Sequence, residues 1–211
     1  MTETDWLTSV DPRPLLHALH GKGNPRKMRL LACACCRRVW DRIVDPASRA
    51  AVEASEQFAD RRMDEWGLMR CGERLRPADT LAHDAAWAAW RGWAVVAAWR
   101  AAEAVESSCA EPLKAAAWLQ ERQGQADLVR EVFGNPFRGC ELPAEWLAWH
   151  RGTVRELAGH VYSRRAFHLM PWLGDALLDA GCTDEAVLDH CRQGGSHVAG
   201  CWVLDLILGM G

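Results

Sequence analysis

The sequence predicts an all-α protein, an irregular bundle of about eight to ten helices around a long, tryptophan-rich central helix. Three observations support this fold class. Runs of alternating β-branched residues, which mark strands, are missing from the whole chain. Apolar residues recur instead at the helical period of about 3.6 residues, in long segments without proline. Capping residues precede these segments, and glycine or proline follows them.

The central helix is expected over residues 81–106. On a helical projection most of its apolar residues share one arc: Trp87, Trp90, Trp93, Ala94, Ala97, Ala101, Ala104 and Val105. Val95 and Trp99 interrupt the polar side. The charged residues lie largely on the other arc: Asp84, Arg91, Arg100, Glu103 and Glu106. This pattern predicts one long amphipathic helix. The chain holds 12 tryptophans, and we interpret most of them as packing residues between helices.

The N-terminal part is expected to begin with two short helices, over 4–7 and 12–20, the second ending at Gly21-Lys22-Gly23. Asn24 as N-cap and Pro25 at the first helical position then predict a stronger helix over 25–43. One arc of this helix is apolar. The opposite arc is basic, and its residues are Arg26, Lys27, Arg37, Arg38 and Arg42.

Two interpretations of the basic arc stay open. It could bind the phosphates of a nucleic acid, or acidic side chains of the next helix could neutralise it. That helix begins at Asp45-Pro46 and carries Glu53, Glu56 and Asp60. We favour neutralisation, because a formal net charge of −3 argues against binding to nucleic acid by bulk charge.

The middle of the chain contains two expected connections. Residues 66–79, with two glycines and a proline, read as a loop. A helix that begins at Glu111-Pro112 should end at the Gly134-Asn135-Pro136-Phe137 turn. We predict a single domain over 1–211, with a subdomain seam near 134–143.

Shorter helices are expected in the C-terminal part. One covers 143–150, a second starts at the capping box that opens with Thr153, and a third covers 171–180. Asp184 lies in the cap of a fourth, and Ser196 can cap a last helix that runs to Leu208.

The nine cysteines do not form a recognisable framework. The number is odd, and no export signal is present. We therefore expect most of them to be reduced and buried. Cys33, Cys35 and Cys36 lie on or beside the apolar arc of helix 25–43, where small soft side chains pack.

One group of residues near the C-terminus has the composition of a metal site. If Ser196 caps a helix, His197 and Cys201 are four residues apart and face the same way. His190 or Cys191 could supply a third ligand across the Gly194-Gly195 turn. A fourth would be water or a side chain from elsewhere, with His160, His168 and Cys36 as candidates. The metal would be zinc. The alternatives are core packing with histidines at helix ends, and thiol catalysis.

Several segments together resemble an expanded family of bacterial proteins of uncharacterised function. They are Trp6-Leu7, the ACACCRRVW segment that ends at Trp40, GNPFR from Gly134, HCR from His190, and HVAGCWVLD from His197. The similarity covers nearly the whole chain and implies a bacterial, cytosolic, single-module protein. Members of that family often carry a basic residue where this chain has Ala199. The resemblance implies no activity and no ligand.

The sequence favours a non-enzymatic protein-interaction or scaffold module that works through an unidentified protein partner. A P-loop, GxGxxG, GxSxG or HExxH motif is not found. The first alternative is a zinc-stabilised regulatory protein, and the second is nucleic-acid binding through helix 25–43. We expect a cytoplasmic location without membrane contact, because the sequence has no signal peptide and no apolar run of about 20 residues.

Overall fold

The computed structural model describes residues 1–19, 24–75, 81–93, 96–97, 100–101, 103–104 and 114–210. All regular elements in these ranges are helices, so the predicted all-α fold is confirmed. The chain forms two compact units, Met1–Arg130 and Glu131–Gly211. The boundary lies a few residues before the segment 134–143 in which we predicted a seam.

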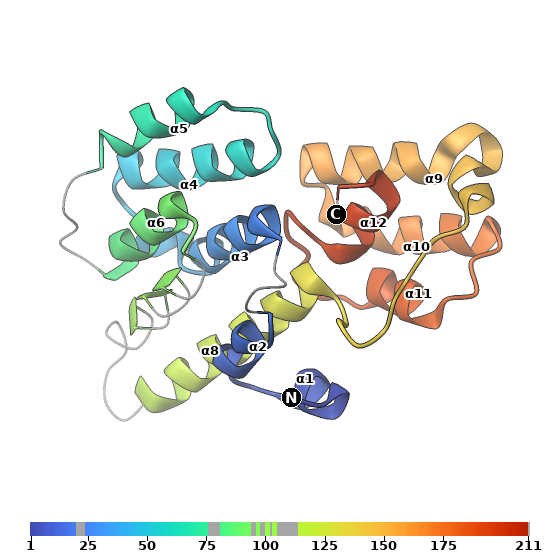
Figure 1. The fold of residues 1–211 in the computed structure, drawn as a ribbon, viewed down its shortest axis with the longest axis horizontal. Helices are drawn as coiled ribbons and strands as arrows, with labels where there is room; N and C mark the ends of the chain where they lie inside the picture. Colours follow the sequence, from blue (N-terminus) through green and yellow to red (C-terminus); the bar gives the residue numbers. More distant parts are fainter. Residues whose placement is uncertain are drawn as a thin grey trace. The chain divides into compact units, whose positions relative to one another are not determined.

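The first unit is built on three helices that pack against one another, α3, α4 and α6 (Figure 1). Its elements are α1 (Glu3–Thr8), α2 (Pro12–Ala18), α3 (Pro25–Arg38), the 3-10 turn η1 (Trp40–Arg42), α4 (Pro46–Ala59), α5 (Glu65–Gly72), α6 (Leu81–Arg91) and most of α8 (Lys114–Phe133). Asn24 caps α3 as predicted, and Asp45 caps α4, which begins at Pro46 as predicted; each side chain accepts a backbone N–H. The apolar arc of α3 is buried, including Cys33, Cys35 and Cys36.

Helix α3 is shorter than the predicted helix 25–43. The backbone leaves helical geometry at Val39, and the turn over Trp40–Arg42 follows. Arg49 of α4 stabilises this turn, since its guanidinium donates to the carbonyls of Ile43 at 2.6 Å and Trp40 at 3.2 Å.

The expected continuous helix 81–106 is interrupted at Gly92. This residue has a φ of +77°, its N–H donates to Ala89, and the N–H of Trp93 donates to Ala88. These two bonds form a Schellman motif, which ends a helix. Helical residues reappear at 96 and 97, whereas Val105 and Glu106 lie outside the described residues. The prediction was wrong at this point because an apolar pattern does not reveal a left-handed glycine.

The end of α6 is held by side chains from α3 and α4. Ser55 donates to the carbonyl of Ala89 at 2.8 Å, and Arg29 donates to the carbonyl of Trp90 at 2.6 Å. The carbonyl of Trp90, past the last helical hydrogen bond, therefore finds a donor inside the unit, and the carbonyl of Ala89, which already accepts the N–H of Gly92, gains a second donor.

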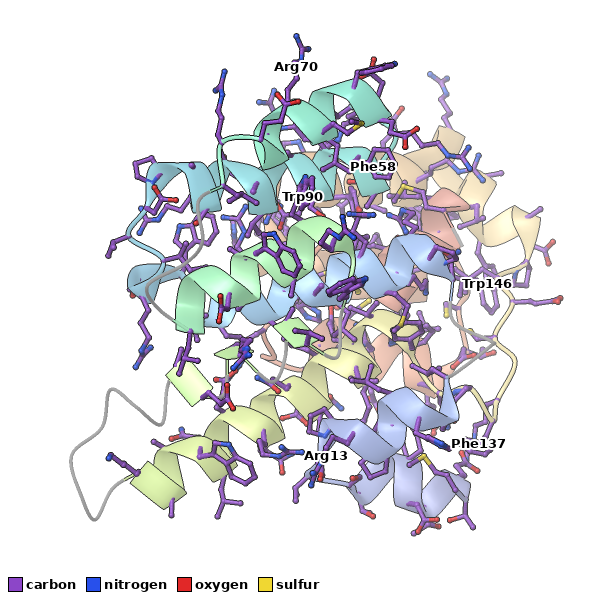
Figure 2. The ribbon with its side chains drawn as sticks, turned by 60° about the vertical axis from the view of Figure 1, so that its left-hand side comes forward. Arg13, Phe58, Arg70, Trp90, Phe137 and Trp146 are labelled. Atoms are coloured by element: carbon purple, nitrogen blue, oxygen red, sulfur yellow. The ribbon has the colours of Figure 1, made fainter. Side chains whose placement is uncertain are left out.

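Part of the expected loop 66–79 is helical. Asp64 caps α5 by accepting the N–H of Gly67 at 2.8 Å. The indole of Trp90, which is labelled in Figure 2, donates to the carbonyl of Leu68 at 2.9 Å. The same ring packs directly on Gly72. The glycines that suggested a loop instead allow close packing on α5. Residues 76–80, the glycine-rich stretch 20–23 and the helix start expected at 111–112 lie outside the described residues.

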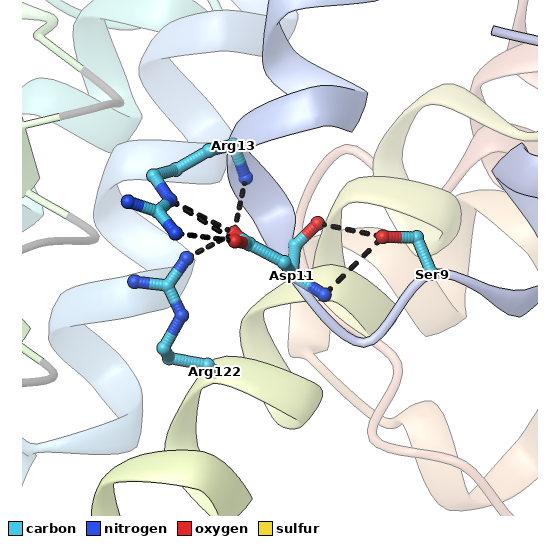
Figure 3. A network of polar contacts seen from close by, with 4 residues as sticks. All are labelled: Ser9, Asp11, Arg13 and Arg122. Atoms are coloured by element: carbon cyan, nitrogen blue, oxygen red, sulfur yellow. Dashed lines mark hydrogen bonds and ion pairs between the residues drawn. The ribbon is translucent and has the colours of Figure 1, made fainter.

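Helices α1 and α2 are tied to α8 by two arginines. Figure 3 shows Asp11, the N-cap of α2, between the guanidinium groups of Arg13 and Arg122. Arg130 donates to the carbonyls of Trp6 at 2.9 Å and Ser9 at 3.0 Å. Trp6 itself is fully buried.

The second unit has its own core, formed where α9, α10, α11 and α12 meet. Its elements are the last turn of α8, α9 (Ala144–Arg164), the 3-10 turn η2 (Phe167–Leu169), α10 (Met170–Asp179), α11 (Glu185–Arg192) and α12 (Trp202–Leu208). Non-helical backbone over 149–152 divides α9 where two helices were predicted. Asp184 caps α11 as expected.

The last helix begins later than predicted. Ser196 does not cap it, because residues 193–201 form a loop and α12 starts at Trp202. Gly200 explains the difference, since its φ of +88° is incompatible with a right-handed helix through 196–201.

None of the helices in the described ranges combines the length and the apolar character that crossing a membrane requires.

Replacing Gly72 with alanine is expected to destabilise the first unit by about 1–3 kcal/mol, because the new methyl group overlaps the ring of Trp90. Urea unfolding measures the change. Gly159→Ala on α9 is the control, since a methyl group there meets only Leu208 at 4.0 Å. That substitution should stabilise its helix by roughly 0.5–1 kcal/mol. Equal effects of the two substitutions would contradict the packing argument.

Asp11 is expected to contribute stability that depends on pH. Partial burial acts to raise its pKa, but hydrogen bonds from Arg13 and the charge of Arg122 outweigh this, and the pKa is lowered. The contribution is therefore complete above about pH 4, the unfolded value, and is lost as the pH falls through the folded-state pKa. In urea titrations, Asp11→Asn should flatten the acid limb of the stability curve. Asp41→Asn, at an exposed position, should leave it unchanged.

Candidate metal centre

Four side chains of the second unit converge on one point. Glu131, His190, His197 and Cys201 each offer a ligand atom, and these atoms lie within 4.8 Å of one another. Cys201 is fully buried, and the side chains of Glu131, His190 and His197 are 10%, 16% and 6% exposed. The group could hold a metal ion.

Glu131 is the acceptor at the centre of the group. One carboxylate oxygen lies 3.1 Å from Nδ1 of His197 and accepts the N–H of Val198 at 3.4 Å. The other oxygen lies 3.2 Å from Nε2 of His190. A carboxylate in the last turn of a helix is disfavoured by the helix dipole. These neighbours offset that cost.

The indole of Trp202 fixes the tautomer of His190. Its Nε1–H donates to Nδ1 of His190 at 3.1 Å. An indole N–H can only donate, so the single proton of the neutral imidazole is on Nε2. That Nε2–H faces Sγ of Cys201 and Oε2 of Glu131, both at 3.2 Å. Burial lowers the pKa of His190, with His197 acting in the same direction and Glu131 against it.

His197 has one ring nitrogen without a hydrogen-bond partner. Its Nδ1 lies 3.1 Å from the carboxylate of Glu131, and its Nε2 is buried and unpartnered. A buried polar atom without a partner is costly.

Cys201 is suited to metal binding and unsuited to free-thiol catalysis. Burial, and then the nearby charge of Glu131, raises the pKa of the thiol well above its ordinary value. Nucleophilic cysteines need the opposite shift. A bound metal ion would deprotonate the thiol outright.

The loop before α12 brings His197 and Cys201 together without the helix that we predicted. The N–H of His197 donates to Gly195, and the N–H of Cys201 donates to Val198. These two tight turns, with Gly200 at positive φ, replace the expected four-residue spacing on a helix.

Cys191 does not join the group. It lies in the apolar core of the second unit, against the position of Gly174. Burial raises the pKa of its thiol to about 12. Adjacent residues on a helix point in different directions, so only His190 of this pair faces the loop.

The fourth member of the group is Glu131, which sequence reasoning missed. The candidates considered for this position, His160, His168 and Cys36, are not among the four converging residues. One feature of the sequence could have pointed to Glu131. It is an acidic residue in the last turn before the predicted helix end, where the helix dipole disfavours a negative charge unless a partner offsets it.

The basic arc of α3 is largely neutralised within the first unit. Arg26 pairs with Asp60 at 2.9 Å, Arg37 with Glu56 at 2.7 Å, and Arg38 with Glu121 at 3.0 Å. Lys27 is half-buried, and Arg42 is exposed at the end of η1. Nucleic-acid binding through this arc would need exposed arginines without carboxylate partners. Arg26, Arg37 and Arg38 do not meet that requirement.

Comparison of the chain with known proteins gives no information about the ligand of this group. No protein-family model, curated protein or solved structure matches the chain. The resemblance to a bacterial family remains a prediction, and the assignment of this group rests on its geometry and chemistry.

Glu131→Ala is expected to destabilise the second unit by roughly 3 kcal/mol or more in chelator-treated protein. Buried donors near the carboxylate lose their acceptor, each at about 1 kcal/mol or more. Chemical unfolding followed by circular dichroism measures the loss. Glu156→Ala, at an exposed position on α9, should change stability by about 0.5 kcal/mol or less. A comparable loss in both variants would argue against a central role for Glu131.

Proposed function

We propose that the second unit is a zinc-stabilised helical module and that Glu131, His190, His197 and Cys201 are the zinc ligands. The observation that carries this proposal is their convergence within 4.8 Å. Imidazole nitrogen, thiolate sulfur and carboxylate oxygen are the donors that zinc prefers in proteins.

The distances support a four-coordinate site. A tetrahedron with zinc–ligand bonds of about 2.0–2.3 Å has edges of roughly 3.3–3.8 Å. Nε2 of His190 lies 3.2 Å from both Sγ of Cys201 and Oε2 of Glu131. Only small shifts of side chains would be needed to surround an ion.

The charges also favour a divalent ion. A carboxylate from Glu131 and a thiolate from Cys201 would balance the two positive charges of zinc, leaving a neutral buried centre. With four protein ligands and little exposure, no position remains for a reacting water. The proposed role is therefore stabilisation and not catalysis.

Trp202 gives the proposal a distinctive consequence. If zinc takes Nε2 of His190, the ring proton must be on Nδ1, where it meets the indole N–H of Trp202. Two donors then face each other across 3.1 Å, and this contact has to open. The indole thus favours the metal-free tautomer and weakens zinc binding.

Zinc affinity is expected to change in opposite directions in two variants. Cys201→Ala removes a ligand and should weaken binding by at least about 100-fold. Trp202→Phe removes the competing N–H and should strengthen binding about tenfold, the equivalent of one hydrogen bond. Competition titration of the full chain against a chromophoric zinc chelator, after removal of metal, measures both.

The matched control is Cys191→Ala, a second buried cysteine close in sequence but outside the group. It should bind one zinc per chain with wild-type affinity. Absence of stoichiometric zinc binding in the wild-type chain would overturn the proposal. So would equal losses in Cys201→Ala and Cys191→Ala.

A second function, binding of a protein partner, is supported by exposed indoles in each unit. Trp66 on α5 is 72% exposed and Trp172 on α10 is 67% exposed. Exposed tryptophans are common contact residues in protein interfaces. Under this proposal zinc would stabilise the helices that carry the α10 surface, and the module would be non-enzymatic.

A further inference from the structure

A groove in the first unit is lined by an unusual number of arginines. It has a volume of about 810 Å³, within the range of small-molecule sites. It lies where the start of α3, the end of α4 and α5 meet, and Figure 2 labels Phe58 of α4 and Arg70 of α5 from its lining. Its charged residues are Arg26, Arg29, Arg61, Arg62, Arg70 and Asp64.

The positive charges of the groove exceed the carboxylates available to them. Arg26 and Arg62 share Asp60, at 2.9 Å and 3.0 Å. Asp64 uses one oxygen to cap α5. Within the described part of the chain, Arg29, Arg61 and Arg70 form no ion pair with any carboxylate. The groove therefore presents uncompensated guanidinium groups.

Arg29 forms a fixed part of the wall. Its guanidinium donates to Ser55 at 3.1 Å and to the carbonyl of Trp90, and it lies 5.0 Å over the ring of Phe58. These contacts are neutral, so they hold the cation in place without cancelling its charge. Burial lowers the pKa of this guanidinium, and an anion in the groove would offset that cost.

Arg61 is held in the groove by a strained turn. Its φ is +57°, in the left-handed region that glycine occupies most easily. The N–H groups of Arg61 and Arg62 donate to Phe58 and Gln57, a Schellman motif that ends α4. The chain thus carries a charged side chain where glycine would be the unstrained choice.

We propose that this groove binds a small organic phosphate, an anion that also carries a planar or apolar group. Guanidinium groups without carboxylate partners suit a phosphate, to which arginine can donate two parallel hydrogen bonds. The remaining lining is apolar and includes Pro25, Phe58, Ala59 and Met63. That surface suits the organic part of the ligand, which inorganic phosphate lacks.

Isothermal titration calorimetry of the full chain tests the proposal with ATP, pyrophosphate and adenosine as probes at matched ionic strength. ATP should bind saturably and at least tenfold more tightly than either pyrophosphate or adenosine. The double variant Arg61→Ala/Arg70→Ala should weaken ATP binding at least tenfold. Arg74→Ala, at an exposed position of the same unit outside the groove, should not change it.

Arg61→Gly separates binding from folding. It relieves the left-handed strain, so the melting temperature should rise while ATP affinity falls. Lack of saturable ATP binding at concentrations up to about 1 mM would overturn the proposal. Binding of pyrophosphate as tight as that of ATP, or equal losses in the double variant and Arg74→Ala, would do the same.

Discussion

Arginine side chains of α3 neutralise carboxylates that the first unit buries. Glu56 of α4, Asp60 at the C-cap of α4 and Glu121 of α8 have side chains that are only 6%, 5% and 5% exposed. Each is paired with an arginine of α3. A buried carboxylate without such a partner would cost several kcal/mol. The basic face of α3 is therefore required by its neighbours, and packing of α3 against α4 depends on this charge matching.

The second unit meets the same constraint with different chemistry. The Glu131 side chain is 10% exposed, and its neighbours are two imidazoles, a thiol and a backbone N–H instead of an arginine. Guanidinium groups hold their protons permanently, whereas imidazole and thiol groups can exchange a proton for a metal ion. The choice of partners explains why one buried carboxylate lies in a permanent ion pair and the other in a candidate metal centre.

Local structure was predicted correctly at helix starts that are marked by a capping side chain. Asn24 and Asp184 cap helices as expected, because a capping bond needs only a few neighbouring residues. The prediction failed at Gly92 and Gly200, where the backbone turns left-handed within an apolar pattern that favours helix. His190, His197 and Cys201 were grouped from their short separation, but Glu131 was missed. Its proximity depends on tertiary packing, which a local pattern does not encode.

The boundary between the units lies within α8, so the position of a truncation decides whether Glu131 stays with the second unit. A C-terminal fragment cut at the seam that the sequence suggests, 134–143, would retain His190, His197 and Cys201 but lose Glu131. Three protein ligands with a vacant fourth position characterise catalytic zinc sites, where water completes the shell. Under the zinc assignment, such a cut would remove one protein ligand and leave one coordination position of the ion to water.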